Sequence, residues 1–321
     1  MQQAIRSRFN RASTAAEVAA GVDLRGKLVV VTGGSVGLGK ETARTLSNTG
    51  ADVFLGARSE AQLEVAQREL GVDGRRVFAH ALDLMDPLSV SSFAAAVLDL
   101  GRPVDILLNN AGIMACPLMR NALGIEAQLA TAYVGHAQLM SLLAPALVSA
   151  RGARVVTLSS IAHQFSPVVL EDLNFNQRPY DKWLAYGQAK TADALLSVRV
   201  AEALGAKGVT ALTVHPGVIQ TDLLRFLTPE DMAESQRRYA SSAEQAASFK
   251  SVAAGAATSI WAATSPDLEG KGSLYLEDCN VAALVDEPNF SHGVLPHALD
   301  KDAARQLWAA AEKMLDQALP L

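Results

Sequence analysis

An apolar run that leads into three glycines constrains the fold of this chain more than any other feature. The run 28–32 predicts a buried strand, and Gly33, Gly37 and Gly39 follow it before a helical pattern that begins near Lys40. Glycines at such a turn let the backbone approach a pyrophosphate at the N-terminus of the helix. The pattern therefore predicts a strand, a phosphate-binding loop and a helix in succession.

Strand-like and helical segments alternate along the rest of the chain. Several strand segments are apolar throughout, as expected for a parallel sheet that is buried on both faces. The alternation predicts a single-domain α/β fold of the Rossmann type, a doubly wound parallel sheet with helices on both faces and right-handed crossovers. The expected strands are residues 28–32, 52–57, 76–81, 104–108, 154–159, 209–214 and 273–276.

Length and composition favour one large domain. The chain has 321 residues, half of them apolar, which suffices for one α/β core. Thr14 and Glu17 form the pattern of a capping box before a short helix. We therefore expect an N-terminal helical arm over residues 1–25, packed outside the sheet, and one domain over residues 26–321.

Charge and cysteine content argue against several function classes. A net charge of −5 and a pI near 5.7 give no electrostatic reason to expect nucleic acid or an anionic membrane surface. Cys116 and Cys279 lack zinc-type spacing, so we expect two reduced thiols, no disulfide framework and no metal. No apolar run approaches the roughly 20 residues that span a bilayer. We expect a cytoplasmic protein with a small-molecule partner.

Tyr186 and Lys190 are candidates for catalysis. They lie four residues apart in a stretch with a helical pattern, so their side chains share one face of a helix. A phenol with a pKa of about 10 is a poor acid or base near neutrality, but a cation one turn away favours the phenolate and lowers that pKa. Tyr186 is therefore a candidate proton donor and acceptor.

Other motifs accompany this pair in a defined order. Asn109–Gly112 closes an apolar strand, Ser160 follows the strand segment 154–159, and Pro216–Thr221 comes after the helix of the pair. Together with the Gly-x-x-x-Gly-x-Gly spacing of the glycine loop, these motifs resemble the short-chain dehydrogenase/reductase family. The resemblance extends from about residue 14 to the C-terminus.

The segments Gly124–Gln128 and Tyr275–Cys279 resemble the retinol-dehydrogenase-like branch of that family, which includes many bacterial oxidoreductases. The resemblance implies an enzyme in which Ser160 polarises a carbonyl, Tyr186 transfers the proton, and Lys190 tunes Tyr186 and holds the cofactor ribose. The cofactor-binding residues that it implies are Gly33, Ser35, Val36, Gly37, Leu38, Gly39, Asp83, Leu84, Asn110, Ala111, Gly112, Tyr186, Lys190, Pro216, Gly217, Val218 and Thr221.

The end of the second strand segment indicates the type of cofactor. NAD-selective enzymes commonly carry a carboxylate there for the ribose 2′-hydroxyl, whereas an arginine suits the 2′-phosphate of NADP. This chain has Ala57 and then Arg58. We therefore expect NADP(H) in preference to NAD(H), with Arg58 on the 2′-phosphate. The alternative is a solvated arginine at the start of a helix.

Ala132 departs from the family pattern. In the branch, the segment that matches Ala132–His136 reads Asn-x-x-Gly-His, so alanine stands where the family has its fourth catalytic residue. The family's asparagine kinks a helix and helps hold a water that connects the lysine to solvent, whereas alanine has no donor or acceptor. This departure keeps open a second function class, a nucleotide-binding family member with lost or redirected, non-redox chemistry.

Two segments, about 161–185 and 222–250, are expected to form the substrate pocket. Their side chains are mainly apolar with few fixed charges, which favours a small hydrophobic carbonyl compound or alcohol as substrate. The alternative for about half of these side chains is core packing. The expected lining residues are Phe165, Phe175, Tyr180, Trp183, Leu223, Leu224, Phe226, Leu227, Met232 and Tyr239.

Four other polar residues receive no catalytic role. His136, His163 and His215 each stand beside a glycine turn or a strand end, which indicates a structural position. Asp193, three residues after Lys190, could steady the cation or compete for it, but a solvated helix face is the expected position. The sequence leaves open whether the protein forms a homodimer.

Overall fold

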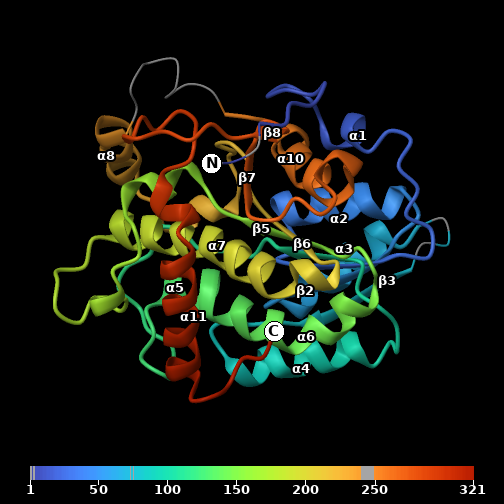
Figure 1. Ribbon diagram of the computed structural model, residues 1–321, viewed down its shortest axis with the longest axis horizontal. Coiled ribbons are helices and arrows are strands. Elements are labelled where there is room, and N and C mark those ends of the chain that lie inside the picture. Colours follow the sequence, from blue (N-terminus) through green and yellow to red (C-terminus); the bar gives the residue numbers. More distant parts are fainter. Residues whose placement is uncertain (1, 3, 73, 75, 240–248) are drawn as a thin grey trace.

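The computed structural model describes residues 2, 4–72, 74, 76–239 and 249–321 (Figure 1). Its strands are β1 Leu28–Thr32, β2 Asp52–Ala57, β3 Val77–Ala81, β4 Ile106–Asn109, β5 Arg154–Leu158, β6 Thr210–His215, β7 Leu274–Glu277 and β8 Asn280–Val281. Within the described residues they form one sheet in the order β3-β2-β1-β4-β5-β6-β7-β8. Neighbours from β3 to β7 are parallel, and β8 is antiparallel to β7.

The seven predicted strands are confirmed, with bounds that agree within two residues. The eighth strand has only two residues and was not predicted, because so short a segment carries no apolar pattern. The strand order reverses between β1 and β4. This reversal makes the sheet doubly wound, and it opens a crevice at the carboxyl ends of these strands.

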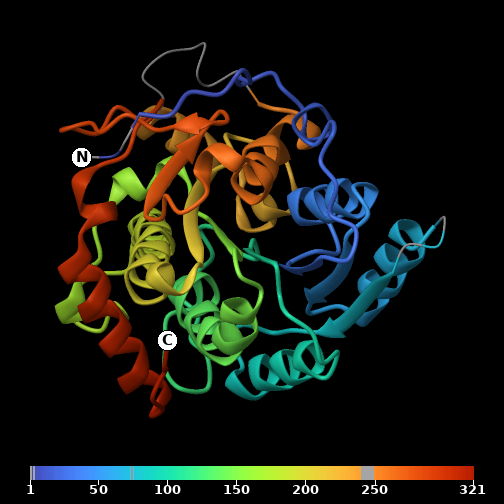
Figure 2. The same cartoon turned by 45° about the vertical axis from the view of Figure 1, so that its right-hand side comes forward.

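Helices cover both faces of the sheet (Figures 1 and 2). They are α1 Ala15–Val18, α2 Gly37–Asn48, α3 Glu60–Leu70, α4 Pro87–Leu98, α5 Ala127–Leu129, α6 Gly135–Ser149, α7 Lys182–Leu204, α8 Pro229–Tyr239, α10 Val252–Thr264 and α11 Lys301–Leu315. Successive strand residues face opposite sides. Val30 and Leu107 pack with α4, α6, α7 and α11 on one face, whereas Val31 and Leu108 pack with α2, α3 and α10 on the other.

Helix α1 of the N-terminal arm packs against α2 and α10, outside the sheet, whereas Arg6 pairs with Asn280 of β8 through an antiparallel β-bridge. The Thr14 side chain accepts a hydrogen bond from the Glu17 backbone, and the Glu17 carboxylate accepts one from the Thr14 backbone, so the capping box is present. Ala15 and Val18 of α1 are buried in the cluster that α2 and α10 share. The division of the chain at residue 25 stays a prediction.

Candidate active site

A cavity of about 460 Å³ occupies the crevice between the two halves of the sheet. The segments that follow β1, β2, β3, β4, β5 and β6 all contribute to its lining, because the carboxyl ends of parallel strands meet at one edge. The predicted site residues that line it are Gly33, Ser35, Val36, Gly37, Leu38, Gly39, Arg58, Asp83, Leu84, Asn110, Ala111, Gly112, Ser160, Tyr186, Lys190, Pro216, Gly217 and Thr221.

Val218 is the exception. Its side chain is half exposed and does not belong to the lining of this cavity. Its carbonyl accepts a hydrogen bond from the backbone N–H of Lys250 at 2.8 Å. Lys250 also pairs with Asp278 at 2.5 Å. Val218 therefore anchors the loop after β6 to a distant segment instead of facing the cavity.

The glycine loop leaves the start of α2 open toward the cavity. The helix begins at Gly37, earlier than the predicted start near Lys40, and its N-cap residue Val36 makes no side-chain hydrogen bond to the first turn. A Cβ at Gly39 would lie 2.2 Å from the carbonyl oxygen of Gly33, so only glycine fits there. The first amides of the helix thus remain available to an anion.

Thr32, the last residue of β1, ties this loop to β4. Its hydroxyl accepts hydrogen bonds from the backbone N–H groups of Asn110 and Ala111, both at 3.0 Å. His136 Nδ1 lies 2.8 Å from the carbonyl oxygen of Ala132, so Nδ1 carries the proton and Nε2 accepts from Thr32 at 2.9 Å. Burial lowers the pKa of His136 to about 4, which keeps the ring neutral. His136 has a structural position, as predicted.

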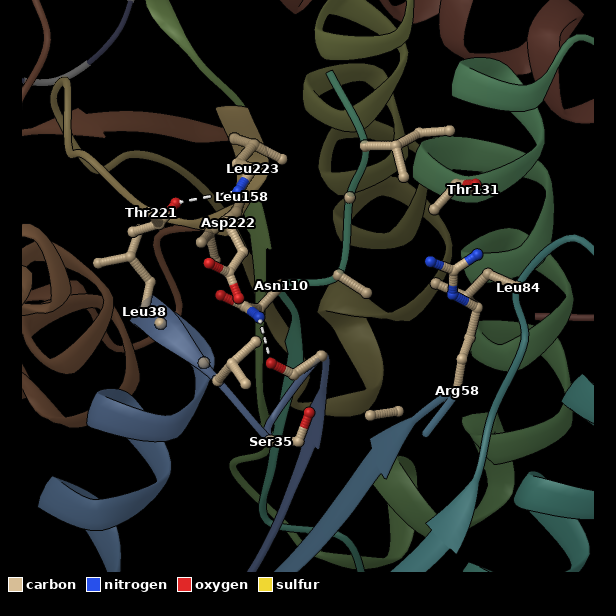
Figure 3. A pocket seen from close by; sticks show the side chains of 18 of the residues that line it. Ser35, Leu38, Arg58, Leu84, Asn110, Thr131, Leu158, Thr221, Asp222 and Leu223 are labelled. Atoms are coloured by element: carbon tan, nitrogen blue, oxygen red, sulfur yellow. Dashed lines mark hydrogen bonds between the residues drawn. The ribbon is translucent and has the colours of Figure 1, made fainter. Parts of the chain in front are cut away.

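Arg58 lies with Leu84 and Thr131 on one side of the cavity, across from Leu38 (Figure 3). It is exposed, and among the described residues no ion pair involves it. Thr131 was missed by the sequence reading, because it immediately precedes the anomalous Ala132 and carries no motif of its own. The guanidinium of Arg58 is thus free to bind an anionic group of a ligand.

Ser160, Tyr186 and Lys190 meet at the same cavity from β5 and α7. Lys190 Nζ lies 5.8 Å from the centroid of the Tyr186 ring and donates to the carbonyl oxygen of Leu158 at 2.9 Å. Ser160 Oγ accepts from the backbone N–H of Ala162 at 3.2 Å, and the Ser160 hydroxyl also makes a hydrogen bond with Tyr186.

Burial changes the pKa of Tyr186 from the value that the sequence predicts. It raises the pKa of this phenol, whereas Lys190 and a hydrogen bond with Ser160 lower it. The net pKa lies above the ordinary value, so the expected net lowering is wrong, because burial outweighs the cation. Burial by itself would lower the pKa of Lys190. Asp193 and Tyr186 together raise this pKa by more than burial lowers it, so the lysine stays charged.

The predicted solvated position of Asp193 is wrong. Its carboxylate is 2% exposed, and its Oδ2 accepts a hydrogen bond from Lys190 Nζ at 2.8 Å. Burial raises the pKa of Asp193 above its ordinary value, while the charge of Lys190 and its hydrogen bond oppose that rise. The spacing of three residues on one helix was the available signal, but α7 is buried around most of its circumference.

Ala132 lies in a π-helical turn, Ala130–Val134, that joins α5 to α6. Its side chain is buried, and its carbonyl accepts the hydrogen bond from His136. The helix is therefore distorted here without the family's asparagine, and His136 holds the distorted turn to β1.

Residues near the C-terminus support the loop that carries Ser160. The Tyr275 hydroxyl donates to the carbonyl oxygen of Ser160 at 2.9 Å. His163 Nε2 accepts from the backbone N–H of Leu295 at 3.2 Å, so Nδ1 carries the proton and donates to the Ser160 carbonyl at 2.8 Å. Burial lowers the pKa of His163 to about 4 and that of His215 to about 3, so neither ring is charged near neutrality.

No residue of the first predicted pocket segment, 161–185, belongs to the lining of the cavity. Phe175 and Trp183 are buried, and neither lines the cavity. Gln188 of α7 accepts from the Val169 backbone at 3.1 Å and donates to the Leu173 carbonyl at 2.8 Å. This amide holds the segment against α7, which explains a long polar side chain between Tyr186 and Lys190.

The second predicted segment contributes more to the cavity. Leu223 lines it as expected, but Asp222 and Arg225 line it too, so the wall carries charges that were not predicted. The side chain of Tyr239 and residues 240–248 lie outside the described residues.

Cys116 and Cys279 are both buried free thiols, and burial raises the pKa of each to about 11. No metal-binding cluster of His, Cys, Asp or Glu occurs in the described ranges. None of the described helices combines the length and apolar character that a bilayer crossing requires.

Comparison with known proteins identifies the family. The model of the family described as short chain dehydrogenase matches residues 27–231. A "Probable oxidoreductase" from Streptomyces antibioticus is 44% identical over 295 residues, which cover 89% of this chain and 97% of that protein. Retinol dehydrogenase 14 from Mus musculus is 34% identical over 305 residues, 91% of this chain and 86% of that protein. The chain belongs to the short-chain dehydrogenase/reductase family of oxidoreductases, as its motifs predicted.

Solved structures agree. An uncharacterised protein from Mycobacterium Paratuberculosis superposes with a TM-score of 0.72 at 32% identity, covering 97% of this chain and all (100%) of the other. A short chain dehydrogenase from Burkholderia cenocepacia, in complex with NADP, has a TM-score of 0.62 at 26% identity and covers 79% of this chain and 96% of the other. The predicted α/β fold is confirmed.

Proposed function

We propose that this protein is an NADP(H)-dependent oxidoreductase that transfers a hydride between the nicotinamide and a hydrophobic ketone or alcohol. One observation carries the proposal: Ser160, Tyr186 and Lys190 border the same cavity as the glycine loop and Arg58. The NADP complex of the Burkholderia cenocepacia relative supports the choice of cofactor.

The residues of the cavity fit a dinucleotide. The open N-terminus of α2 and the close packing at Gly39 suit a pyrophosphate. Arg58 follows β2 where a carboxylate would favour NAD, and an arginine there favours a 2′-phosphate. Lys190 would bind the ribose with an N–H that faces the cavity.

The proposed chemistry assigns each side chain one task. A bound nicotinamide supplies or accepts the hydride. Ser160 donates a hydrogen bond to the substrate oxygen and polarises the carbonyl. Tyr186 gives its proton to that oxygen during reduction and takes it back during oxidation, while the positive charge of Lys190 stabilises the phenolate in between.

The test is a substrate and cofactor panel with the purified protein. We expect oxidation of NADPH with at least one hydrophobic ketone, and NADPH affinity ten to one hundred times higher than NADH affinity, as charge-assisted hydrogen bonds of about 1.5 to 3 kcal/mol allow. Equal affinities for the two cofactors would contradict the assignment. A sugar phosphate serves as the matched polar substrate and should not react.

The alternative of lost or redirected chemistry rested on Ala132 alone. The relatives named above are an oxidoreductase and a dehydrogenase, which lends it no support. The cytoplasmic location and the question of a homodimer stay predictions from the sequence.

A further inference from the structure

Asp193 is a buried charge that the proposed chemistry does not use. The residues Asp193 and Lys190 are 2% and 5% exposed, and a hydrogen bond of 2.8 Å joins the Lys190 ammonium to the Asp193 carboxylate. Among the described residues, Asp193 accepts a hydrogen bond from Lys190 alone. A buried charge without a partner is costly, so each member of this pair requires the other.

The hydrogen bond with Asp193 helps to determine where the third N–H donor of Lys190 can point. An ammonium has three N–H donors. One donates to the Leu158 carbonyl at 2.9 Å and a second to Asp193. A Cβ at Gly112 would lie 3.7 Å from Nζ, so the ammonium borders the cavity there. Leu158 and Asp193 thus leave one donor for the cavity.

The π-helical turn offers no polar side chain to this lysine at residue 132. Ala132 has neither a donor nor an acceptor in its side chain, and its carbonyl is already bound by His136. The polar side-chain partner of Lys190 therefore comes from its own helix, α7, in the form of Asp193.

His136 and Tyr275, two other titratable groups that face the pair, are neutral near pH 7. His136 faces it from α6, and burial lowers the pKa of this ring to about 4. Tyr275 faces it from β7, and burial raises the pKa of this phenol far above its ordinary value. Glu277 acts on Tyr275 through its charge, and His163 lies 3.1 Å from the Tyr275 hydroxyl. The charged groups that act on Tyr186 are therefore the two members of this pair.

We propose that Asp193 is a positioning residue for hydride-transfer chemistry: it directs the Lys190 ammonium toward the cavity and limits the pull of its positive charge on the Tyr186 proton. The proposal rests on the proposed function of the site. It explains why a carboxylate stands at a buried helix position where an apolar side chain would pack at lower cost.

The sign of the effect follows from the charges. Asp193→Asn keeps an oxygen that can accept from Lys190 Nζ but removes the negative charge. Lys190 then acts on Tyr186 without opposition, and the phenolate forms at lower pH. We expect the pH midpoint of alcohol oxidation to fall by about one unit. Asp193→Glu should keep the midpoint near that of the parent, because the charge remains.

A second readout does not depend on turnover. The absorbance of phenolate is measured against pH in the parent and in Asp193→Asn. The same titration is run with Tyr186→Phe added to each protein, and the difference between the two curves gives the titration of Tyr186. We again expect a shift of about one unit to lower pH. If the parent turns over no ketone or alcohol, the proposed function is wrong. The titration still tests the effect of Asp193 on Tyr186, because it does not require turnover.

Controls separate this role from a purely structural one. Asp172→Asn changes another buried carboxylate, whose partners are the backbone N–H groups of residues 176–178 and the guanidinium of Arg178, and should leave both midpoints in place. If Asp193→Asn does not fold, as judged by circular dichroism, Asp193→Ser replaces it as the neutral variant. An unchanged or raised midpoint in the folded neutral variant overturns the proposal.

Discussion

The two ends of the cavity carry their charges in different ways. At the Arg58 end the cation is exposed and unpaired among the described residues, and the neighbouring glycine loop offers backbone amides. At the other end Lys190 is buried, and its charge is balanced by Asp193. The exposed charge of Arg58 is available to a ligand, whereas the buried Lys190–Asp193 pair acts on Tyr186 through its electric field. The first end should therefore govern affinity, and the second the chemical step.

Tyr186→Phe tests the chemical end and should have the largest effect. The variant keeps the ring and removes the proton-carrying oxygen, so we expect turnover to fall by about one hundred to ten thousand times. NADPH affinity, measured by fluorescence titration, should stay within about twofold, because the variant keeps Arg58, the glycine loop and Lys190, which are proposed to bind the cofactor.

Tyr133→Phe is the matched control for that variant. The Tyr133 hydroxyl is buried and makes no hydrogen bond to any described residue. Its removal should leave turnover at the parental rate. A Tyr186→Phe protein that is as active as the parent would exclude Tyr186 as the proton donor.

Arg58→Ala tests the affinity end. Loss of the guanidinium removes charge-assisted hydrogen bonds to a 2′-phosphate, and we expect NADPH affinity to fall by about ten to one hundred times. NADH affinity should not change, since NADH has no such phosphate. Arg68→Ala removes an exposed charge from the last turn of α3 and should leave both affinities as they are. Equal losses for NADPH and NADH would mean that Arg58 does not read the phosphate.

Ala132→Asn restores the family's residue and should have the smallest effect. The helix is already distorted, and Lys190 already has two partners. Waters can bridge polar groups at a cost of about 0 to 2 kcal/mol each, so a proton path does not need the amide. We expect turnover to change by less than about tenfold, or about 1.4 kcal/mol of barrier. A gain of one hundredfold or more in steady-state turnover would show that proton supply limits the natural protein.

The Arg58 end of the cavity was also easier to predict from the sequence than the buried Lys190–Asp193 end. The glycine loop and the strands can be read directly, because backbone geometry and burial on both faces restrict the residue types at each position. Arg58 could be located for the same reason, at the end of a strand. The burial of Asp193 could not be predicted, because it depends on the packing of α7 against β5, β6 and α11.

The substrate side was predicted less well. Apolar residues in a loop signal burial but not the surface that they bury against, and Phe175 and Trp183 pack inside the protein. Arg225 reaches the cavity from a 3₁₀ helix, Asp222–Phe226, whose position no local pattern encodes.

The support of the Ser160 loop by residues far along the chain limits how this protein can be recombined with its relatives. The family model ends at residue 231, whereas Tyr275 and Leu295, which hold the Ser160 carbonyl and the His163 ring, lie beyond it. A chimera that took residues 27–231 from another enzyme would set a foreign serine loop against a tail shaped for His163. The Ser160 loop and the C-terminal segment that contacts it should therefore be taken from the same parent protein, although more than one hundred residues separate them in the chain.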